Sequence, residues 1–247
     1  MPNAYIIIPA YNEEGNLPLL LDDLISLQLP VSKKIVLVDD GSRDKTLDIA
    51  RQYQGKIDME IIIHEVNAGI PKTFYDGLKK ASELAEEDDA IFIIEGDCTS
   101  DLNIMPQMID MIRGGSDIVV ASRYIKGGKY KNFPFIRTLG SGIVNIVLKI
   151  FFKTNGVTDY TIFYRGYSAR IIKKAFEKYQ EGFITQKSFA ANLEVLLKVR
   201  EFSNRNSEVP LVYDYGLKKG KSKMKLFKTL GEYRSLILKR IVGRSLW

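Results

Sequence analysis

Residues 89–101 read Asp-Ala-Ile-Phe-Ile-Ile-Glu-Gly-Asp-Cys-Thr-Ser-Asp. We predict a short buried strand over 90–94 that brings two carboxylates, Glu95 and Asp97, to its carboxyl end. In an open α/β sheet, ligands bind at that end of the strands. Two acids separated by one residue can share a hard cation such as Mg²⁺ or Mn²⁺, which takes oxygen ligands and keeps positions for phosphate. The alternative for this segment alone is an acidic turn that only keeps a loop soluble.

The same order of strand and then helix is repeated on both sides of this segment. Short apolar strands joined by amphipathic helices imply crossover connections and a mostly parallel sheet that helices cover on both faces. The expected fold class is therefore α/β, with a Rossmann-like sheet in one domain over 1–222. The remaining strands are predicted at 4–8, 34–38, 60–63, 117–121 and 208–213, and a late helix is predicted over 183–200.

The basic charge of the chain is concentrated at its end. The net charge is +6, but residues 216–247 hold ten lysines or arginines and one acid, Glu232, which gives this segment +9. From Lys223 onward, a helix is predicted with an apolar side and a basic rim, and we treat 223–247 as a separate amphipathic tail. Such a tail is attracted to an anionic surface, either phospholipid or nucleic acid.

Several classes of protein are disfavoured by what the chain lacks. We expect no secretory signal, since the first apolar run, 5–8, is short and is followed by Pro9. No apolar run reaches the length of a spanning helix. The single cysteine, Cys98, excludes an intrachain disulfide and suits a reducing cytoplasm. The single histidine, His64, is expected to have a structural role. The loop at 216–222 is one residue short of a phosphate-binding P-loop.

Polar residues also follow the first two strands. Pro9 and Tyr11 could form the floor of a base pocket, and Glu13 could accept hydrogen bonds from a base or a sugar. The paired carboxylates Asp39 and Asp40 could accept from a base N–H and a ribose hydroxyl. The alternatives are a proline turn with an acid at a helix start, and a capping turn. A dinucleotide site has little support because the glycine fingerprint is absent.

In order along the chain, these segments resemble the family-2 glycosyltransferases of the GT-A fold, and most closely the dolichol-phosphate mannosyltransferase and polyprenyl-phosphate glycosyltransferase group. The similarity runs from about residue 4 to 225. The matching words are Ile8-Pro9-Ala10-Tyr11-Asn12-Glu13, Val38-Asp39-Asp40-Gly41-Ser42, Asn67-Ala68-Gly69, Glu95-Gly96-Asp97, Ser122-Arg123-Tyr124-Ile125-Lys126-Gly127-Gly128, Arg137-Thr138-Leu139-Gly140-Ser141 and Gly220-Lys221-Ser222-Lys223.

The resemblance implies a role for each group of residues. The nucleoside and the rest of the substrate would be held by Pro9, Tyr11, Glu13, Asp39, Asp40, Lys218, Lys219, Lys221 and Lys223. The metal, Mg²⁺ or Mn²⁺, would be held by Glu95, Asp97 and Thr99. Asp97, Arg123 and Arg137 would form the catalytic group, with the arginines holding phosphates. The reaction would be an inverting, metal-dependent transfer of mannose or glucose from a nucleotide-sugar to a polyprenyl (dolichyl) phosphate.

The sequence departs from this family at four points. Glu95 stands where the metal motif usually begins with Asp, and Thr99 stands where close relatives commonly have Gln. The segment 161–165 replaces an SGFR-like word, and the 216–223 loop has lysines where arginines are usual. The changed 161–165 word keeps open a family-2 transferase with a glycan or another non-lipid acceptor.

With a lipid acceptor, the expected location is the cytoplasmic face of a membrane, to which the protein would bind peripherally. Two amphipathic segments, 139–152 and the basic tail, could contact an anionic membrane surface. Both could instead pack on the domain or on a second subunit. A third hypothesis is a non-enzymatic module whose tail binds nucleic acid, but no reader module is evident, and we expect no nucleic-acid partner.

Overall fold

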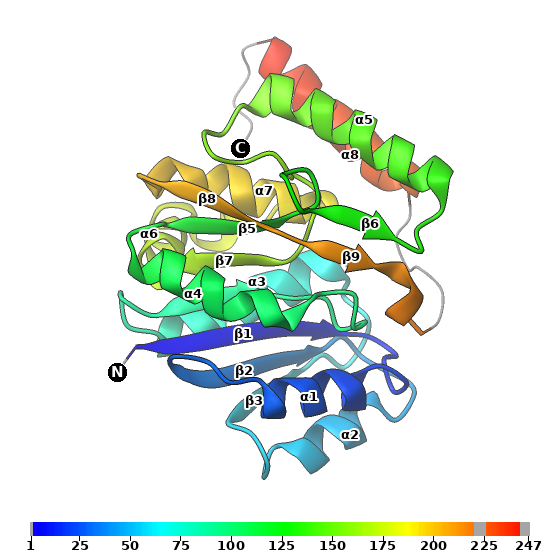
Figure 1. Cartoon of the computed structure of the whole chain (residues 1–247), viewed down its shortest axis with the longest axis vertical. Coiled ribbons are helices and arrows are strands. Elements are labelled where there is room, and N and C mark those ends of the chain that lie inside the picture. Colours follow the sequence, from blue (N-terminus) through cyan, green and yellow to red (C-terminus); the bar gives the residue numbers. More distant parts are fainter. Residues whose placement is uncertain (1, 220–225, 243–247) are drawn as a thin grey trace.

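The computed structural model describes residues 2–219 and 226–242, which form a three-layer α/β arrangement (Figure 1). Seven strands form one sheet in the order β3-β2-β1-β4-β7-β5-β8, and a small second sheet pairs β6 with β9. The strands are β1 (Asn3–Ala10), β2 (Ser32–Asp39), β3 (Met59–Ile63), β4 (Ala90–Ile93), β5 (Ile118–Ser122), β6 (Lys129–Lys131), β7 (Arg165–Ser168), β8 (Asn206–Pro210) and β9 (Val212–Asp214).

Helices cover both faces of the sheet. In Figure 1, α1 and α4 lie in front of it, while α3, α6 and α7 pack together behind it. The helices are α1 (Leu17–Ser26), α2 (Thr46–Tyr53), α3 (Ile70–Leu84), α4 (Met105–Arg113), α5 (Phe135–Phe152), α6 (Ala169–Tyr179), α7 (Ala190–Val199) and α8 (Leu226–Ile241). Short 3₁₀ turns are η1 (Leu102–Ile104), η2 (Gln180–Phe183), η3 (Arg200–Phe202) and η4 (Tyr215–Leu217).

The predicted sheet is confirmed, and burial explains why its strands are continuously apolar. In β1, residues 4–8 are all buried, and none of them is more than 2% exposed. β1 pairs in parallel with both β2 and β4, which places the carboxyl ends of all three strands at one edge. β7 runs antiparallel between β4 and β5, so the sheet is mostly rather than wholly parallel.

The predicted bounds of one helix and one strand are wrong, and hydrogen bonds explain both differences. The helix predicted over 183–200 begins only at Ala190, because the Glu194 carboxylate accepts from the amides of Thr185 and Gln186 and turns that segment into a loop. The strand predicted over 208–213 is divided at Leu211, whose amide donates to the carbonyl of Ser122. The chain leaves β5 at this point and pairs with β6 instead.

α7 contains a buried ion pair. Glu194 and Lys198 are one helical turn apart, their Oε1 and Nζ atoms are 2.7 Å apart, and both side chains are fully buried. Lys198 also donates to the carbonyl oxygens of Gly182 and Phe183. Through these hydrogen bonds the pair fixes the loop that precedes α7, and the same bonds satisfy most of the polar atoms of the two buried side chains.

Lys33 gives a first testable prediction about stability. Its ammonium donates to the carbonyls of Leu24, Ile25 and Leu27 at the carboxyl end of α1, where helical carbonyls lack partners. We expect Lys33→Met to lower the free energy of unfolding by about 1–2 kcal/mol in urea denaturation, because a cation at this end also complements the helix dipole. Lys174→Met on the exposed side of α6 is the control. Equal stability of both variants would contradict this role.

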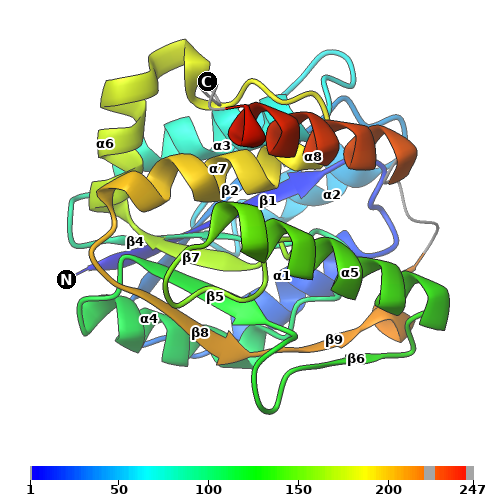
Figure 2. The same ribbon diagram turned by 90° about the horizontal axis from the view of Figure 1, so that it is seen from above.

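The helices that could face a lipid surface lie at one end of the molecule. α5 and α8 pack against each other beside the β6–β9 sheet, and α8 also contacts α7 (Figures 1 and 2). Among the described residues, no helix is both long enough and apolar enough to cross a bilayer. The amphipathic helix predicted in the tail is present as α8.

Candidate active site

The carboxyl ends of β1 and β4 meet tightly at one edge of the sheet. The amide of Ile94 donates to the carbonyl of Ile7 at 3.1 Å, which continues the pairing one residue beyond β4. A Cβ atom on Gly96 would lie 2.9 Å from the carbonyl oxygen of Pro9, so only glycine fits there. Cys98 has a φ of +64°, a left-handed conformation that is uncommon outside glycine. This strained turn directs the acids that precede it into the site.

Glu95 and Asp97 are joined by a hydroxyl. The Thr99 hydroxyl lies 3.2 Å from Glu95 Oε2 and 2.5 Å from Asp97 Oδ1, and the Thr99 amide also donates to Asp97 Oδ1 at 3.2 Å. Burial, and then the charge of Asp97, raises the pKa of Glu95 to about 8. Two carboxylates held together in a buried place favour a bound cation, because a cation stabilises their ionised forms.

The site supplies oxygen ligands that suit a divalent cation, but fewer than such a cation needs. The described residues contain no group of three or more His, Cys, Asp and Glu side chains arranged to hold a metal. Two carboxylates and a hydroxyl are an incomplete set for Mg²⁺ or Mn²⁺, which takes its remaining ligands from water or substrate phosphates. The donor set of Glu95, Asp97 and Thr99 therefore fits a metal that arrives with a phosphate ligand.

A loop from the far end of the chain reaches the same acids. Lys218, just after η4, makes an ion pair with Asp97 Oδ2. The next residue is held by its backbone: the Lys219 amide donates to Asn16 Oδ1, and Asn16 Nδ2 donates to the Lys219 carbonyl, both at 3.0 Å. Asn16, only 3% exposed, was not predicted as a site residue. In the structure it stands at the N-cap position of α1.

Arg123 lies beside the acids and is already paired. Its Nε and Nη2 atoms each lie 2.7 Å from an oxygen of Asp159, and Nη2 also donates to the Thr161 hydroxyl at 2.7 Å. Burial alone would lower the pKa of Arg123, but the charge and hydrogen bonds of the Asp159 carboxylate outweigh it, so the pKa of Arg123 is raised. The positive charge of Arg123 acts on Glu95 as well. Arg123 thus places a permanent positive charge next to the acid pair.

Three tyrosine rings surround the Arg123 guanidinium. The ring centroids of Tyr124, Tyr130 and Tyr213 lie 5.6, 4.9 and 5.6 Å from its central carbon. The hydroxyls of Tyr124 and Tyr130 both contact the Ser141 hydroxyl on α5, at 3.1 and 2.8 Å. Tyr213 is buried, and burial followed by the charges of Glu95 and Asp97 raises its pKa. No sequence pattern pointed to Tyr213, which reaches the acids from β9.

The two acids after β2 have different environments. Asp39 is 2% exposed, and its Oδ1 atom is buried with no hydrogen-bond partner among the described residues. Both carboxylate oxygens of Asp40 are instead occupied by hydrogen bonds. They accept from His64 Nδ1, Asn67 Nδ2 and the amides of Ala68 and Gly69 at 2.8–2.9 Å. The expectation that Asp40 contacts the substrate is corrected here, because its lone pairs are occupied in shaping the turn at 67–69. Asp39 keeps an oxygen available for a ligand.

The residues after β1 are near the same edge. The Glu13 carboxylate accepts from Asn16 Nδ2 at 2.6 Å, and its backbone carbonyl accepts from the amides of Asn16 and Leu17 at the start of α1. A Cβ on Gly96 would lie 3.9 Å from Glu13 Cγ, so Glu13 adjoins the acid turn. Pro9 and Tyr11 are partly exposed at the end of β1 and just beyond it. The structure therefore brings Pro9, Tyr11 and Glu13 to the edge that carries the acids.

The remaining basic candidates are more loosely held or lie outside the described residues. Arg137 is exposed on α5, and its Nη1 atom is 3.4 Å from the Tyr215 hydroxyl in η4. Lys219 is exposed, and Lys218 is largely covered. Lys221 and Lys223 lie outside the described residues. Arg137 thus contacts the turn that directly precedes Lys218.

Cys98 and His64 both have structural contacts, and a structural role was expected for His64. Burial raises the pKa of the Cys98 thiol to about 11, and its Sγ contacts the Asn16 carbonyl at 3.4 Å. A thiol that stays protonated is a poor nucleophile. His64 is held between Asp40 and Asp76, with each ring nitrogen 2.8 Å from a carboxylate oxygen. It connects the end of β3 to α3.

Comparison with known proteins identifies related sequences and folds. The family model described as glycosyl transferase family 2 matches residues 5–176. Dolichol-phosphate mannosyltransferase of Pyrococcus furiosus is 34% identical over 134 residues, which are 54% of this chain and 37% of that protein. UDP-N-acetylglucosamine–dolichyl-phosphate N-acetylglucosaminyltransferase of Methanococcus voltae is 28% identical over 95% of each chain. Polyprenol monophosphomannose synthase of Mycolicibacterium smegmatis is 30% identical over 68% of this chain and 63% of that protein.

Solved structures agree on the fold. TarS 1-349 of S. aureus in complex with UDP-GlcNAc superposes with a TM-score of 0.63 at 20% identity, covering 100% of this chain and 68% of that chain. Glucosyl-3-phosphoglycerate synthase of Mycobacterium tuberculosis, in complex with Mn²⁺, UDP and glucosyl-3-phosphoglycerate, gives a TM-score of 0.63 at 13% identity, covering 98% of this chain and 80% of that chain. The chain spans little more than a third of the P. furiosus relative's length.

Proposed function

The chain belongs to glycosyl transferase family 2 and has the GT-A fold, and from this premise we propose that it transfers a hexose from a nucleotide-sugar to a polyprenyl phosphate with the help of a divalent metal. The observation that carries the proposal is the pair of acids Glu95 and Asp97, bridged by Thr99 and placed beside Arg123 and Lys218. The names of the three relatives support a dolichyl or polyprenyl phosphate acceptor.

The proposed donor site lies between β1, β2 and the acid turn. The unpartnered Asp39 oxygen would accept from the nucleoside, and Pro9, Tyr11 and Glu13 would border the same space. Glu95, Asp97 and Thr99 would hold Mg²⁺ or Mn²⁺. When bound, that metal would stabilise the negative charge that develops on the departing nucleoside diphosphate. Arg123 would add a second, permanent positive charge on the same side.

The acceptor side needs orientation more than it needs a strong base. A lipid phosphate is already largely ionised near neutral pH, so its oxygen can attack the anomeric carbon in a single in-line step that inverts the configuration. Arg137 and the lysines at 218–223 would hold donor or acceptor phosphates, since guanidinium and ammonium groups pair with phosphate oxygens. We name no general base.

A radiolabelled donor tests the reaction. We expect label from a nucleotide-sugar to enter the organic phase with polyprenyl phosphate as acceptor, and EDTA to abolish this transfer. The donor panel should contain mannose and glucose nucleotides, and also UDP-N-acetylglucosamine because of the M. voltae relative's name. Label that stays in the aqueous phase on a glycan acceptor would support the alternative acceptor class instead.

Burial weakens the main argument for a glycan acceptor. That argument depended on the unusual 161–165 segment, but Phe163, Tyr164 and Arg165 are at most 7% exposed. Arg165 donates to the Asn192 side chain and to the Tyr160 carbonyl in the interior. These three residues pack inside the domain and have little opportunity to select an acceptor, whereas Thr161 is half-buried and accepts from Arg123.

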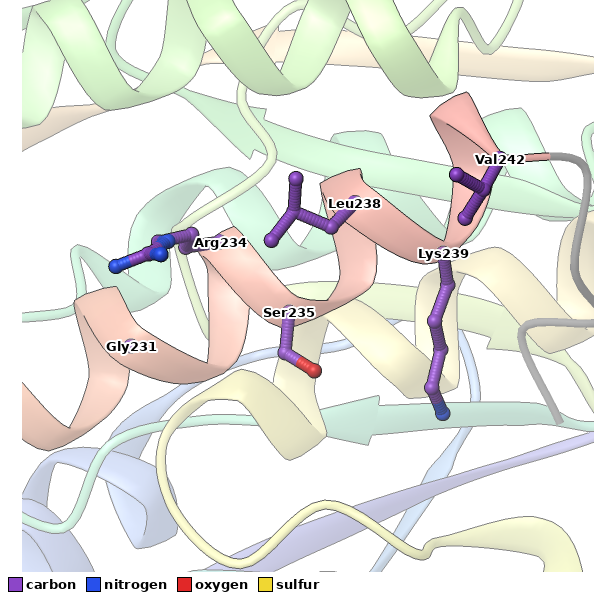
Figure 3. Close-up of a pocket in the computed structure, with 6 residues that line it drawn as sticks. All are labelled: Gly231, Arg234, Ser235, Leu238, Lys239 and Val242. Atoms are coloured by element: carbon purple, nitrogen blue, oxygen red, sulfur yellow. The ribbon is translucent and has the colours of Figure 1, made fainter.

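We further propose that α5 and α8 dock the protein on an anionic membrane. Five apolar residues, spaced three or four apart, form a stripe along α5 and are 55–79% exposed: Phe135, Leu139, Ile143, Ile146 and Ile150. α5 contains Arg137 and Lys149 but no acid. On the outer side of α8, Leu238 and Val242 adjoin Arg234 and Lys239 around a hollow of about 460 Å³ (Figure 3). Apolar and basic side chains combined in this way suit an anionic interface.

Liposome flotation gives the prediction for this surface. We expect Ile143→Glu/Ile146→Glu to lower binding to vesicles of anionic phospholipid by at least about a hundredfold, because burying each isoleucine contributes roughly 1.5–3 kcal/mol. The matched control is Leu19→Glu/Leu84→Glu, which changes two exposed leucines on α1 and α3. Equal flotation of both double variants would contradict membrane docking through α5, and equal recovery from neutral and anionic vesicles would contradict the basic contribution.

A further inference from the structure

Lys218 is anchored where a divalent cation would bind. Its ammonium pairs with Asp97, and the two side chains are only 14% and 7% exposed. A buried carboxylate such as Asp97 is stabilised by positive charge nearby, and Lys218 provides that charge within the protein. Burial opposes the charge of Lys218, but the charge of Asp97 and their hydrogen bond raise its pKa, so it stays a cation.

Lys218 and a metal need the same oxygen. Asp97 Oδ1 already accepts from the Thr99 hydroxyl and amide, at 2.5 and 3.2 Å. Its other oxygen, Oδ2, is the one that Lys218 holds. A protonated amine has no lone pair with which to ligate a metal, and it repels one at contact distance. Lys218 must therefore leave Oδ2 before a divalent ion can use it.

The backbone keeps Lys218 close after it has left. The Asn16 side chain holds both polar backbone atoms of Lys219 at 3.0 Å, and neither bond involves Glu95 or Asp97. The Asp214 carboxylate fixes the preceding turn by accepting from the Gly216 amide at 2.9 Å. Metal binding would break the Lys218 contact but leave these anchors intact. The displaced ammonium would then remain within reach of an anion bound at the metal.

We propose that Lys218 is a resident counter-cation that a divalent metal must displace from Asp97, so that metal binds weakly alone and strongly together with a nucleoside diphosphate. The inference rests on the proposed function, because it takes the acid pair to be the metal site. The diphosphate supplies metal ligands and also a new anionic partner for the displaced Lys218. Metal and nucleotide would consequently bind as a unit.

Electron paramagnetic resonance of free Mn²⁺ tests this without measuring turnover. We expect Lys218→Met to raise the affinity for Mn²⁺ alone by about tenfold, within the range usual for coupled binding events. Adding UDP or GDP should narrow the difference in Mn²⁺ affinity between this variant and the wild type, because Lys218 of the wild type then contacts the diphosphate. Lys218→Arg keeps the cation and should bind Mn²⁺ alone as weakly as the wild type does.

Two controls make the outcomes distinguishable. Lys219→Met removes an exposed neighbouring charge but keeps the backbone contacts to Asn16, so it should leave Mn²⁺ affinity unchanged. A rise equal to that of Lys218→Met would mean general electrostatics, and would overturn the inference. An unchanged affinity in a folded Lys218→Met would also overturn it. If the wild type fails to bind Mn²⁺ even with UDP or GDP, the proposed metal site itself is wrong.

Discussion

Asp97→Asn is expected to lower kcat/KM for sugar transfer by about a thousandfold or more, the scale of losing a preorganised charge at the reacting group. The substitution removes the charge that a metal needs while preserving the size of the side chain. The Asn oxygen can still accept from Thr99, so the turn at 97–99 keeps its hydrogen bonds. The same variant should bind Mn²⁺ weakly even with UDP or GDP present.

The stability of this variant separates a catalytic role from a structural one. Asn removes the repulsion between two carboxylates but also removes the Lys218 ion pair, and we expect these effects to offset each other to within about 1 kcal/mol. Asp101→Asn is the matched control, because Asp101 caps η1 through the Asn103 amide and Asn caps equally well. Activity retained by Asp97→Asn in the presence of EDTA would contradict the metal role of the acid pair.

The sequence was sufficient for the fold because the first five strands carry their own signals. β1 to β4 are short, mostly apolar runs, each followed by a helical pattern, and they form a continuous parallel part of the sheet, with the partly exposed β3 at its edge. β5 is apolar and fully buried. β6 and β7 carried no such signal: β6 has three residues, and β7 begins with the charged Arg165. Their pairing depends on contacts with β9, β4 and β5, which are distant in sequence.

The site was predictable where it follows a strand end, and not where it depends on long-range contacts. The placement of Glu95, Asp97 and Asp39 at one edge of the sheet could be predicted because the carboxyl ends of parallel strands share an edge. Asp159 and Asn16 were missed, since their role depends on partners 36 and 203 residues away. Asp40 was assigned to the substrate because adjacent acids look alike in sequence, whereas their hydrogen bonds differ.

Arg123→Met is expected to destabilise the fold and also to lower activity. Asp159 is fully buried and would lose its bidentate partner, and breaking a buried pair by removing one member costs about 3–5 kcal/mol. Activity should fall at least about a hundredfold, because a permanent positive charge beside Glu95 would be lost. Arg113→Met on α4 is the control, since that arginine is exposed and only weakly paired. Urea denaturation and label transfer measure the two effects separately.

The conservative variant and the pH dependence distinguish the two roles of Arg123. Arg123→Lys keeps the charge near Asp159 but loses the planar fork, so we expect it to restore most of the stability and little of the activity.

Burial alone would raise the pKa of Asp159, yet Arg123 holds it below its ordinary 3.8. The stability that this pair contributes to the wild type is therefore present above 3.8 and lost as the pH falls through the folded pKa. In Arg123→Met the unpaired carboxyl has a raised pKa instead, and protonating it on acidification relieves the penalty. A variant as stable as the wild type at neutral pH, with the same acid transition, would contradict the pairing and leave Arg123 with only an electrostatic role at the site.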